Sequence, residues 1–245
     1  MTTIKNVCKS LLLVFFTAIL FSCNNSTDTK TDDAKKGDTA SATPPPPPTP
    51  PVAEFKPFDV LEVKHAVKDY AAWRPVFDKD SVNRKASGLE TAVVGRNNDK
   101  PNNVFIALMA ADVQKAKDFS ADPRLKDVMS KGGVISKPDI AMFHVLRFNA
   151  ESHENKWVIV THKVKDFDSW LKVYDGEGKD KRMSEGMVDV LLGRGIEDPN
   201  LVQIVFDITD MTKAKAAIFS DEKKKLMTSA GVEGKPVIEF YNTAE

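Results

Sequence analysis

Two histidines in matching surroundings are the residues of this 245-residue chain best suited to chemistry. His65 opens the stretch HAVKDYAAW, and His162 opens the similar stretch HKVKDFDSW. Imidazole titrates near neutral pH, so a histidine can serve as an acid, as a base or as a group that orients a ligand. The competing interpretation is that each imidazole caps the end of a strand and bonds to nearby backbone. The sequence favours this structural role and keeps both histidines as catalytic candidates.

A tryptophan and an arginine accompany each histidine and form a candidate ligand-binding set. Trp73 and Trp170 could stack on a ligand, although a tryptophan on the inner face of a helix usually belongs to the core. Arg96 and Arg194 end predicted strands beside a turn, where an arginine could hold an anionic ligand. A salt bridge or an exposed position is the commoner role for such an arginine.

Signatures of other chemistries are missing from the sequence. No cluster of His, Cys, Asp or Glu has metal-ligand spacing, and His144 and His153 have no counterpart that would make a symmetric metal site. There is no G-x-G-x-x-G, no P-loop and no G-x-S-x-G elbow. We therefore expect neither a metal nor a cofactor. With 35 basic and 35 acidic residues, the chain has no basic surplus that would suit a nucleic-acid partner.

The matching surroundings arise because the chain repeats itself. Residues of the first half recur in the second half at a constant spacing, and one inserted residue later shifts that spacing by one. The matches continue to the end of the chain, which indicates a duplication. Matched pairs include Val63 and Val160, Asp69 and Asp166, Val76 and Val173, Gly95 and Gly193, and Pro138 and Pro236.

Both halves predict the same order of elements. Apolar, β-branched stretches at 59–65 and 157–163 predict the first strands. Helices follow, with N-caps expected at Asp69, Asp112, Asp166 and Asp210. The remaining predicted strands are 91–96, 103–110 and 138–148, with counterparts at 188–194, 201–208 and 236–242. The order is β-α-β-β-α-β, the split βαβ or ferredoxin-like unit.

Two such units can cover each other's sheets. A sheet with helices on one side leaves its other face bare, and apolar residues on that face need cover. The element order, the tandem copy and the H-x-V-x-D-[YF]-x-x-W opening resemble the dimeric α/β-barrel proteins, among them cofactor-free antibiotic-biosynthesis monooxygenases. The resemblance implies an α+β fold in which two ferredoxin-like units, 57–150 and 155–245, pack sheet to sheet as an intramolecular dimeric α/β barrel. Such a chain would be monomeric. Related barrels bind haem, but no lone axial histidine marks a haem site here.

The start of the chain resembles the leader of an anchored protein. A basic start and a short apolar core fit a secretory signal peptide over 1–22. LFSC at 20–23 resembles a bacterial lipobox, in which Cys23 would be lipidated. Residues 23–56 are polar and then proline-rich, which suits an unfolded tether. We therefore expect a cell-envelope protein anchored to a membrane, most simply the outer membrane, through Cys23.

Two functions are compatible with these features. The first is a lipid-anchored module that binds a small molecule or interacts with a partner. The second, implied by the resemblance, is a cofactor-independent monooxygenase, isomerase or cyclase acting on a small aromatic or polyketide-like compound. The sequence favours the first, because it shows no set of nucleophile, base and orienting group. A closed pocket of about 300 Å³ or more at both histidines would support a ligand site.

Overall fold

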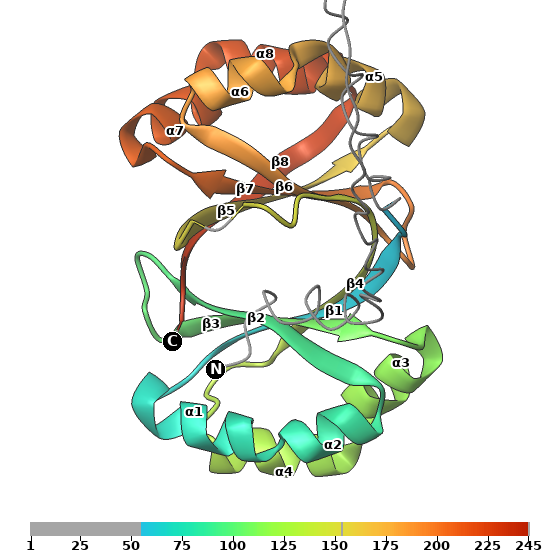
Figure 1. Ribbon diagram of the computed structural model, residues 1–245, viewed down its shortest axis with the longest axis vertical. Helices are drawn as coiled ribbons and strands as arrows, with labels where there is room; N and C mark the ends of the chain where they lie inside the picture. The colour runs from blue at the N-terminus through green and yellow to red at the C-terminus, as the bar shows by residue number, and fades with distance from the viewer. Residues whose placement is uncertain (1–54, 153, 245) are drawn as a thin grey trace, which may run out of the picture.

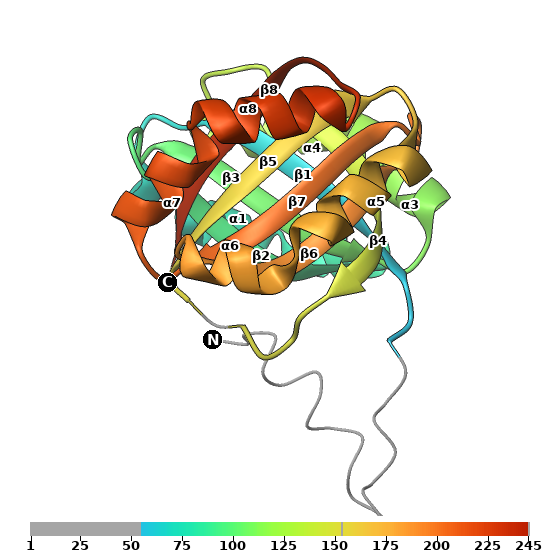
Figure 2. The ribbon, with the colours of Figure 1, turned by 90° about the horizontal axis from the view of Figure 1, so that it is seen from above.

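The protein is described by a computed structural model covering residues 55–152 and 154–244. The predicted signal peptide over 1–22, Cys23 and residues 24–54 of the predicted tether lie outside the described residues. Two layers of helices enclose one closed antiparallel barrel (Figure 1), and the view from above shows the strands crossing beneath the helices (Figure 2). This confirms the predicted α+β class. No described helix is long and apolar enough to cross a membrane.

The first half of the chain forms one sheet and one helical layer. Its strands are β1 (Phe58–Ala66), β2 (Leu89–Asn97), β3 (Asn103–Ala110) and β4 (Asp139–Phe148). Its helices are α1 (Tyr70–Lys79), α2 (Ser81–Ala86), α3 (Val113–Ala121) and α4 (Pro123–Lys131). In space the strands lie in the order β4-β1-β3-β2, as expected for a ferredoxin-like unit.

The second half repeats this arrangement. Its strands are β5 (Lys156–Val164), β6 (Met187–Gly195), β7 (Leu201–Ile208) and β8 (Val232–Thr243). Its helices are α5 (Phe167–Glu177), α6 (Lys179–Ser184), α7 (Met211–Ile218) and α8 (Asp221–Ser229). The strand order is β8-β5-β7-β6. Figure 1 shows the two halves one above the other, each with its helices on the outside.

Local sequence signals place the helix starts where they were predicted. The side chains of Asp69, Asp112, Asp166 and Asp210 each accept a hydrogen bond from a backbone N–H in the first turn. Each region predicted as a single helix is instead two short helices. Asp80 separates α1 from α2, and Gly178, in the left-handed region with φ 82°, separates α5 from α6.

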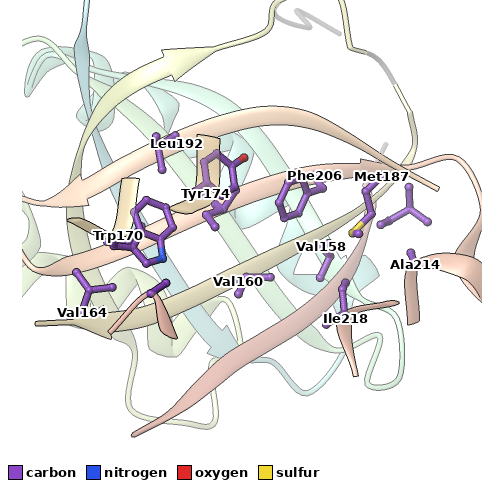
Figure 3. Packing of buried hydrophobic residues seen from close by; sticks show 14 of the residues in the cluster. Val158, Val160, Val164, Trp170, Tyr174, Met187, Leu192, Phe206, Ala214 and Ile218 are labelled. Carbon is purple, nitrogen blue, oxygen red and sulfur yellow. The ribbon is translucent and has the colours of Figure 1, made fainter. Parts of the chain in front are cut away.

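The two halves complete one another at their sheet edges. β2 pairs with β8 and β4 pairs with β6, which closes the barrel in the order β1-β3-β2-β8-β5-β7-β6-β4. Side chains alternate along each strand, so one face of each sheet packs on helices and the other lines the barrel interior. The helix-facing core of the second half includes Trp170, Tyr174 and Phe206, which Figure 3 shows packed over the sheet.

The barrel interior contains both an aromatic cluster and charged groups. Trp157 stacks on Tyr241, with ring centroids 4.8 Å apart, and Phe105 meets the indole edge-on at 5.2 Å. Near them, Gln203 Nε2 donates to Glu62 Oε2 at 2.8 Å, and Lys64 Nζ lies 2.6 Å from Glu239 Oε2. Both polar contacts join the first half to the second. They therefore connect the two sheets across the interior.

Candidate functional site

His65 and His162 occupy the same place in the two halves, near the ends of β1 and β5 on the helix-facing side. Both side chains are buried, with exposed fractions of 6% and 5%. Each imidazole lies against the tryptophan that follows it in the repeat: the ring centroids are 5.7 Å apart for His65 and Trp73, and 5.5 Å for His162 and Trp170. The repeated strand–helix joint is what brings each pair together.

None of the four ring nitrogens of these histidines has a hydrogen-bond partner among the described residues. The backbone hydrogen bonds expected for a purely structural histidine are therefore not formed. Burial lowers the pKa of both His65 and His162 to about 4, so both rings are neutral at ordinary pH. A neutral imidazole can donate from one nitrogen and accept at the other.

A small cavity lies against His162, between the sheet and helices α5, α6 and α8. Its volume is about 60 Å³, which is room for about two water molecules. The walls beside His162 are mostly apolar and include Trp170, Val160 and Phe206 (Figure 3). His65 is not among the residues lining this cavity. A closed pocket of about 300 Å³ or more at both histidines would have supported a ligand site. The cavity beside His162 is smaller than that, and His65 does not line it.

Charged side chains stand at one side of this cavity. The Nε and Nη2 atoms of Arg182 both donate to the carboxylate of Asp189, at 2.7 Å each. The ammonium of Lys223 contacts Glu177 and also lies 3.2 Å from Glu185. These residues belong to no recognisable catalytic pattern in the sequence. The one sequence feature that could have indicated Arg182 is its match with Arg84 in the repeat.

Trp73 and Trp170 are core residues, each with an exposed fraction of 3%. Trp73 stacks on Phe77 with centroids 4.8 Å apart, and Trp170 stacks on Tyr174 at 5.2 Å. Trp170 also lines the cavity at His162. The structure therefore brings His162 and Trp170 together at one hollow, and places His65 and Trp73 together away from it.

Arg96 and Arg194 lie apart from the histidines and brace the turns that follow β2 and β6. Their Nε atoms donate to the carbonyls of Pro101 and Pro199, at 2.8 Å in both cases. The guanidinium of Arg96 lies over the ring of Tyr70, 4.4 Å from its centroid, and that of Arg194 lies 3.9 Å from the centroid of the Phe167 ring. Neither arginine lines the cavity at His162.

Within residues 55–152 and 154–244, no group of three or more His, Cys, Asp or Glu side chains is arranged to hold a metal ion. His144, which the repeat left without a counterpart, has its Nδ1 atom 2.7 Å from Asp59 Oδ1. This pair is partly exposed at the edge of the first sheet and lies on a different strand pair from His162.

Comparison with known proteins identifies the fold of this chain through solved structures. No family model matches the sequence, and neither does any curated protein. Among solved structures the chain is similar to an anthrone oxidase-like protein, with a TM-score of 0.53 and 13% identity over 77% of this chain and 92% of that one. It is also similar to a candidate monooxygenase from Fusobacterium nucleatum, with a TM-score of 0.51 and 14% identity over 77% of this chain and 93% of that one.

A candidate monooxygenase from Lactobacillus acidophilus gives a TM-score of 0.50 and 13% identity, over 76% of this chain and 94% of that one. At such identities the likeness establishes the shared fold of ferredoxin-like units around a barrel. A shared fold does not by itself define an activity.

Proposed function

We propose that the second half of the chain binds a small, mainly apolar molecule beneath α5, α6 and α8, with a polar group of the ligand at His162. The observation that carries this proposal is a buried imidazole with two unpartnered nitrogens beside a cavity. Buried polar groups in folded proteins are nearly always hydrogen-bonded. A water molecule or a ligand would therefore complete the bonding of His162. The aromatic and aliphatic walls suit a ring.

The size of the cavity limits how the ligand can enter. A cavity that holds benzene is about 150 Å³, whereas the space at His162 is about 60 Å³. Ligand binding therefore requires some of the lining side chains to move. Leu226 and Met227 on α8 line the cavity, and a methionine in particular adapts its shape at little cost. We infer that the ligand enters under α8.

The chemistry of His162 favours orienting a ligand over removing its proton. Because burial holds the pKa of His162 at about 4, transfer of a phenolic proton with a pKa of about 10 would be uphill by about 6 units, or about 8 kcal/mol. Accepting a hydrogen bond from the same hydroxyl carries no such cost. His162 would thus fix the orientation of a bound phenol-type compound.

A second candidate function uses the same cavity for catalysis. In this interpretation the chain is a cofactor-independent monooxygenase, isomerase or cyclase that acts on a small aromatic or polyketide-like compound. The names of the solved neighbours, one anthrone oxidase-like and two candidate monooxygenases, support this interpretation over a binding module alone. The protein would then act by positioning its substrate, since the ring of His162 is a weak base.

Binding of phenol and benzene to the full chain tests the proposed site. Phenol is expected to bind about tenfold more tightly than benzene, because its hydroxyl can donate to His162. His162→Leu should remove this preference. His65→Leu, the same change at the matching position of the other half, should keep it. NMR chemical-shift titration measures the affinities, and equal affinities of phenol and benzene for the unaltered protein would refute the site. Oxygen uptake with anthrone, present in the unaltered protein and lost in His162→Leu, would establish the catalytic alternative.

We also propose that Cys23 is lipidated and holds the protein at a membrane of the cell envelope, with residues 24–56 as a tether. The lipobox-like LFSC at 20–23 supports this. The chain would act as a monomer, since each sheet already covers the other within it. Labelled palmitate is expected to enter the unaltered chain and not Cys23→Ser, and detergent extraction should follow the label. Equal labelling of both forms would contradict anchoring at this residue.

A further inference from the structure

We propose that the first half of the chain carries a second, separate site: a pocket for a small oxyanion at Arg96. A hollow of about 400 Å³ lies where the end of β2, the turn after it, the start of α1 and the end of β8 meet. The polar residues that line it are Tyr70, Arg96, Asn97, Asn242 and Thr243, and none of the described residues that line it is an acid. Its volume falls within the usual range for small-molecule pockets.

Arg96 is held in place and keeps hydrogen-bonding capacity to spare. Its Nε atom donates to the carbonyl of Pro101 at 2.8 Å, and its guanidinium rests on the Tyr70 ring. Its two terminal nitrogens make no hydrogen bond or ion pair with any residue of 55–152 and 154–244. A planar guanidinium fixed in this way matches the two oxygens of a carboxylate or a phosphate.

The hydroxyl groups of the pocket are also left as donors. The Tyr70 oxygen already accepts from Arg74 Nη1 at 3.1 Å, and Thr243 Oγ1 accepts from Trp157 Nε1 at 3.1 Å. A hydroxyl has one hydrogen to donate, and in both residues no group in the described part of the chain accepts that hydrogen. Both hydroxyls can therefore donate to a ligand that accepts.

The Asn97 side chain also has an accepting oxygen in use and hydrogens left to donate. Its side-chain oxygen accepts from the backbone N–H groups of Asp99 and Lys100, at 3.1 and 3.0 Å. Its amide nitrogen carries two hydrogens, one of which can serve the nearby Tyr241 hydroxyl. Together with Arg96, these side chains present mainly donors and one positive charge. An anion with several acceptor oxygens is the ligand that such a lining recognises.

In the second half, Arg194 occupies the position that corresponds to Arg96, and its neighbours differ. Arg194 keeps the contact to a proline carbonyl and the stacking on an aromatic ring. In the strand pairing, Thr243 lies opposite Gly95, as Val145 lies opposite Gly193. The polar residues Tyr70, Asn97 and Thr243 thus correspond to Phe167, Gly195 and Val145. A polar residue lies opposite the arginine in both halves, Asn242 opposite Arg96 and His144 opposite Arg194. The arginine has a structural role in both halves, and the donors at positions 70, 97 and 243 belong to the first half alone.

Titration of the full chain with inorganic phosphate and, separately, with acetate tests the site. Saturable shifts of the Arg96 Nε and Thr243 amide signals are expected in NMR spectra. Arg96→Met should weaken binding about tenfold or more. Arg194→Met, which removes the same structural contacts in the other half, should leave the affinity unchanged, as should His162→Leu.

Tyr70→Phe keeps the ring beneath Arg96 and removes the hydroxyl that can donate to the ligand, together with the acceptor of the Arg74 hydrogen bond. It decides the question if Arg96→Met fails to fold. It should weaken binding several-fold. Saturation by acetate alone would identify a carboxylate ligand, and saturation by phosphate a phosphate ligand; either supports the site. No saturable shift with either anion, an unchanged affinity in Tyr70→Phe, or an equal loss in Arg194→Met would overturn it.

Discussion

Glutamine in place of Glu62 is expected to make the protein about 3 kcal/mol more stable above pH 7 and to change its stability little near pH 4.5. Glu62 points into the barrel interior with an exposed fraction of 4%. Burial there raises its pKa from 4.5 to about 7, although the hydrogen bond from Gln203 and the charge of Lys64 act in the opposite direction. Glu239 and Asp139 add a smaller upward contribution.

The sign of the effect follows from proton binding. Between pH 4.5 and about 7 the folded protein keeps a proton on Glu62 that the unfolded chain has released. Stability therefore falls as pH rises through this window, and the whole loss is present above the folded pKa. A glutamine at this position cannot ionise and can still accept the hydrogen bond from Gln203.

Urea unfolding of both proteins at about pH 5 and about pH 8.5 measures this difference. The lowered pKa values of His65 and His162 make every variant lose stability as pH falls from 6.5 towards 4. Subtracting the unaltered protein from the variant cancels that contribution. Glu90→Gln, on an exposed residue of β2, is the control and should show no trend. A constant difference between Glu62→Gln and the unaltered protein at both pH values would rule out the interpretation.

Methionine in place of Arg182 is expected to lower the free energy of unfolding by about 4 kcal/mol. Arg182 is 2% exposed. Besides its two hydrogen bonds to Asp189, its Nη1 atom donates to the Tyr174 carbonyl at 3.0 Å and lies 3.4 Å from Glu177 Oε2. Methionine fills much of the same volume but leaves the Asp189 carboxylate without its partner. Removing one member of a buried ion pair costs more than the pair itself contributes.

Arg84→Met is the matched control in the first half. Arg84 is also buried, with an exposed fraction of 4%, and it donates to the Phe77 carbonyl at 2.8 Å. Its nearest carboxylate oxygen, on Asp80, is 3.6 Å away, and burial lowers the pKa of Arg84. The loss of this weaker pairing should cost about 1–2 kcal/mol. Chemical unfolding measures the free energy of unfolding of the two variants. Equal losses would contradict the prediction that the contacts with Asp189 and Glu177 make Arg182 the more stabilising of the two arginines.

The candidate site was only partly visible in the sequence. The repeat pointed to His162 and Trp170, because a duplicated strand–helix joint keeps neighbouring residues together. It pointed equally to His65 and Trp73, which do not line the cavity at His162. The difference lies in how α8 and α6 cover the sheet, and Lys223 and Arg182 reach the site from those helices. Such contacts join residues far apart in the chain, where local patterns carry no signal.

The sequence alone determined the order of strands and helical regions, the first cap of each helical region and the pairing of two like units, because each depends on local periodicity or on a repeat. The capping role of Asp69 and Asp166 is one example: it needs only the first turn of the helix that follows. The tertiary structure decided which polar groups meet. Glu62 and Gln203 replace Ile159 and Phe105 of the opposite repeats, but only closure of the barrel brings β1 and β7 to face each other. Burial there, and not residue type, gives Glu62 its raised pKa.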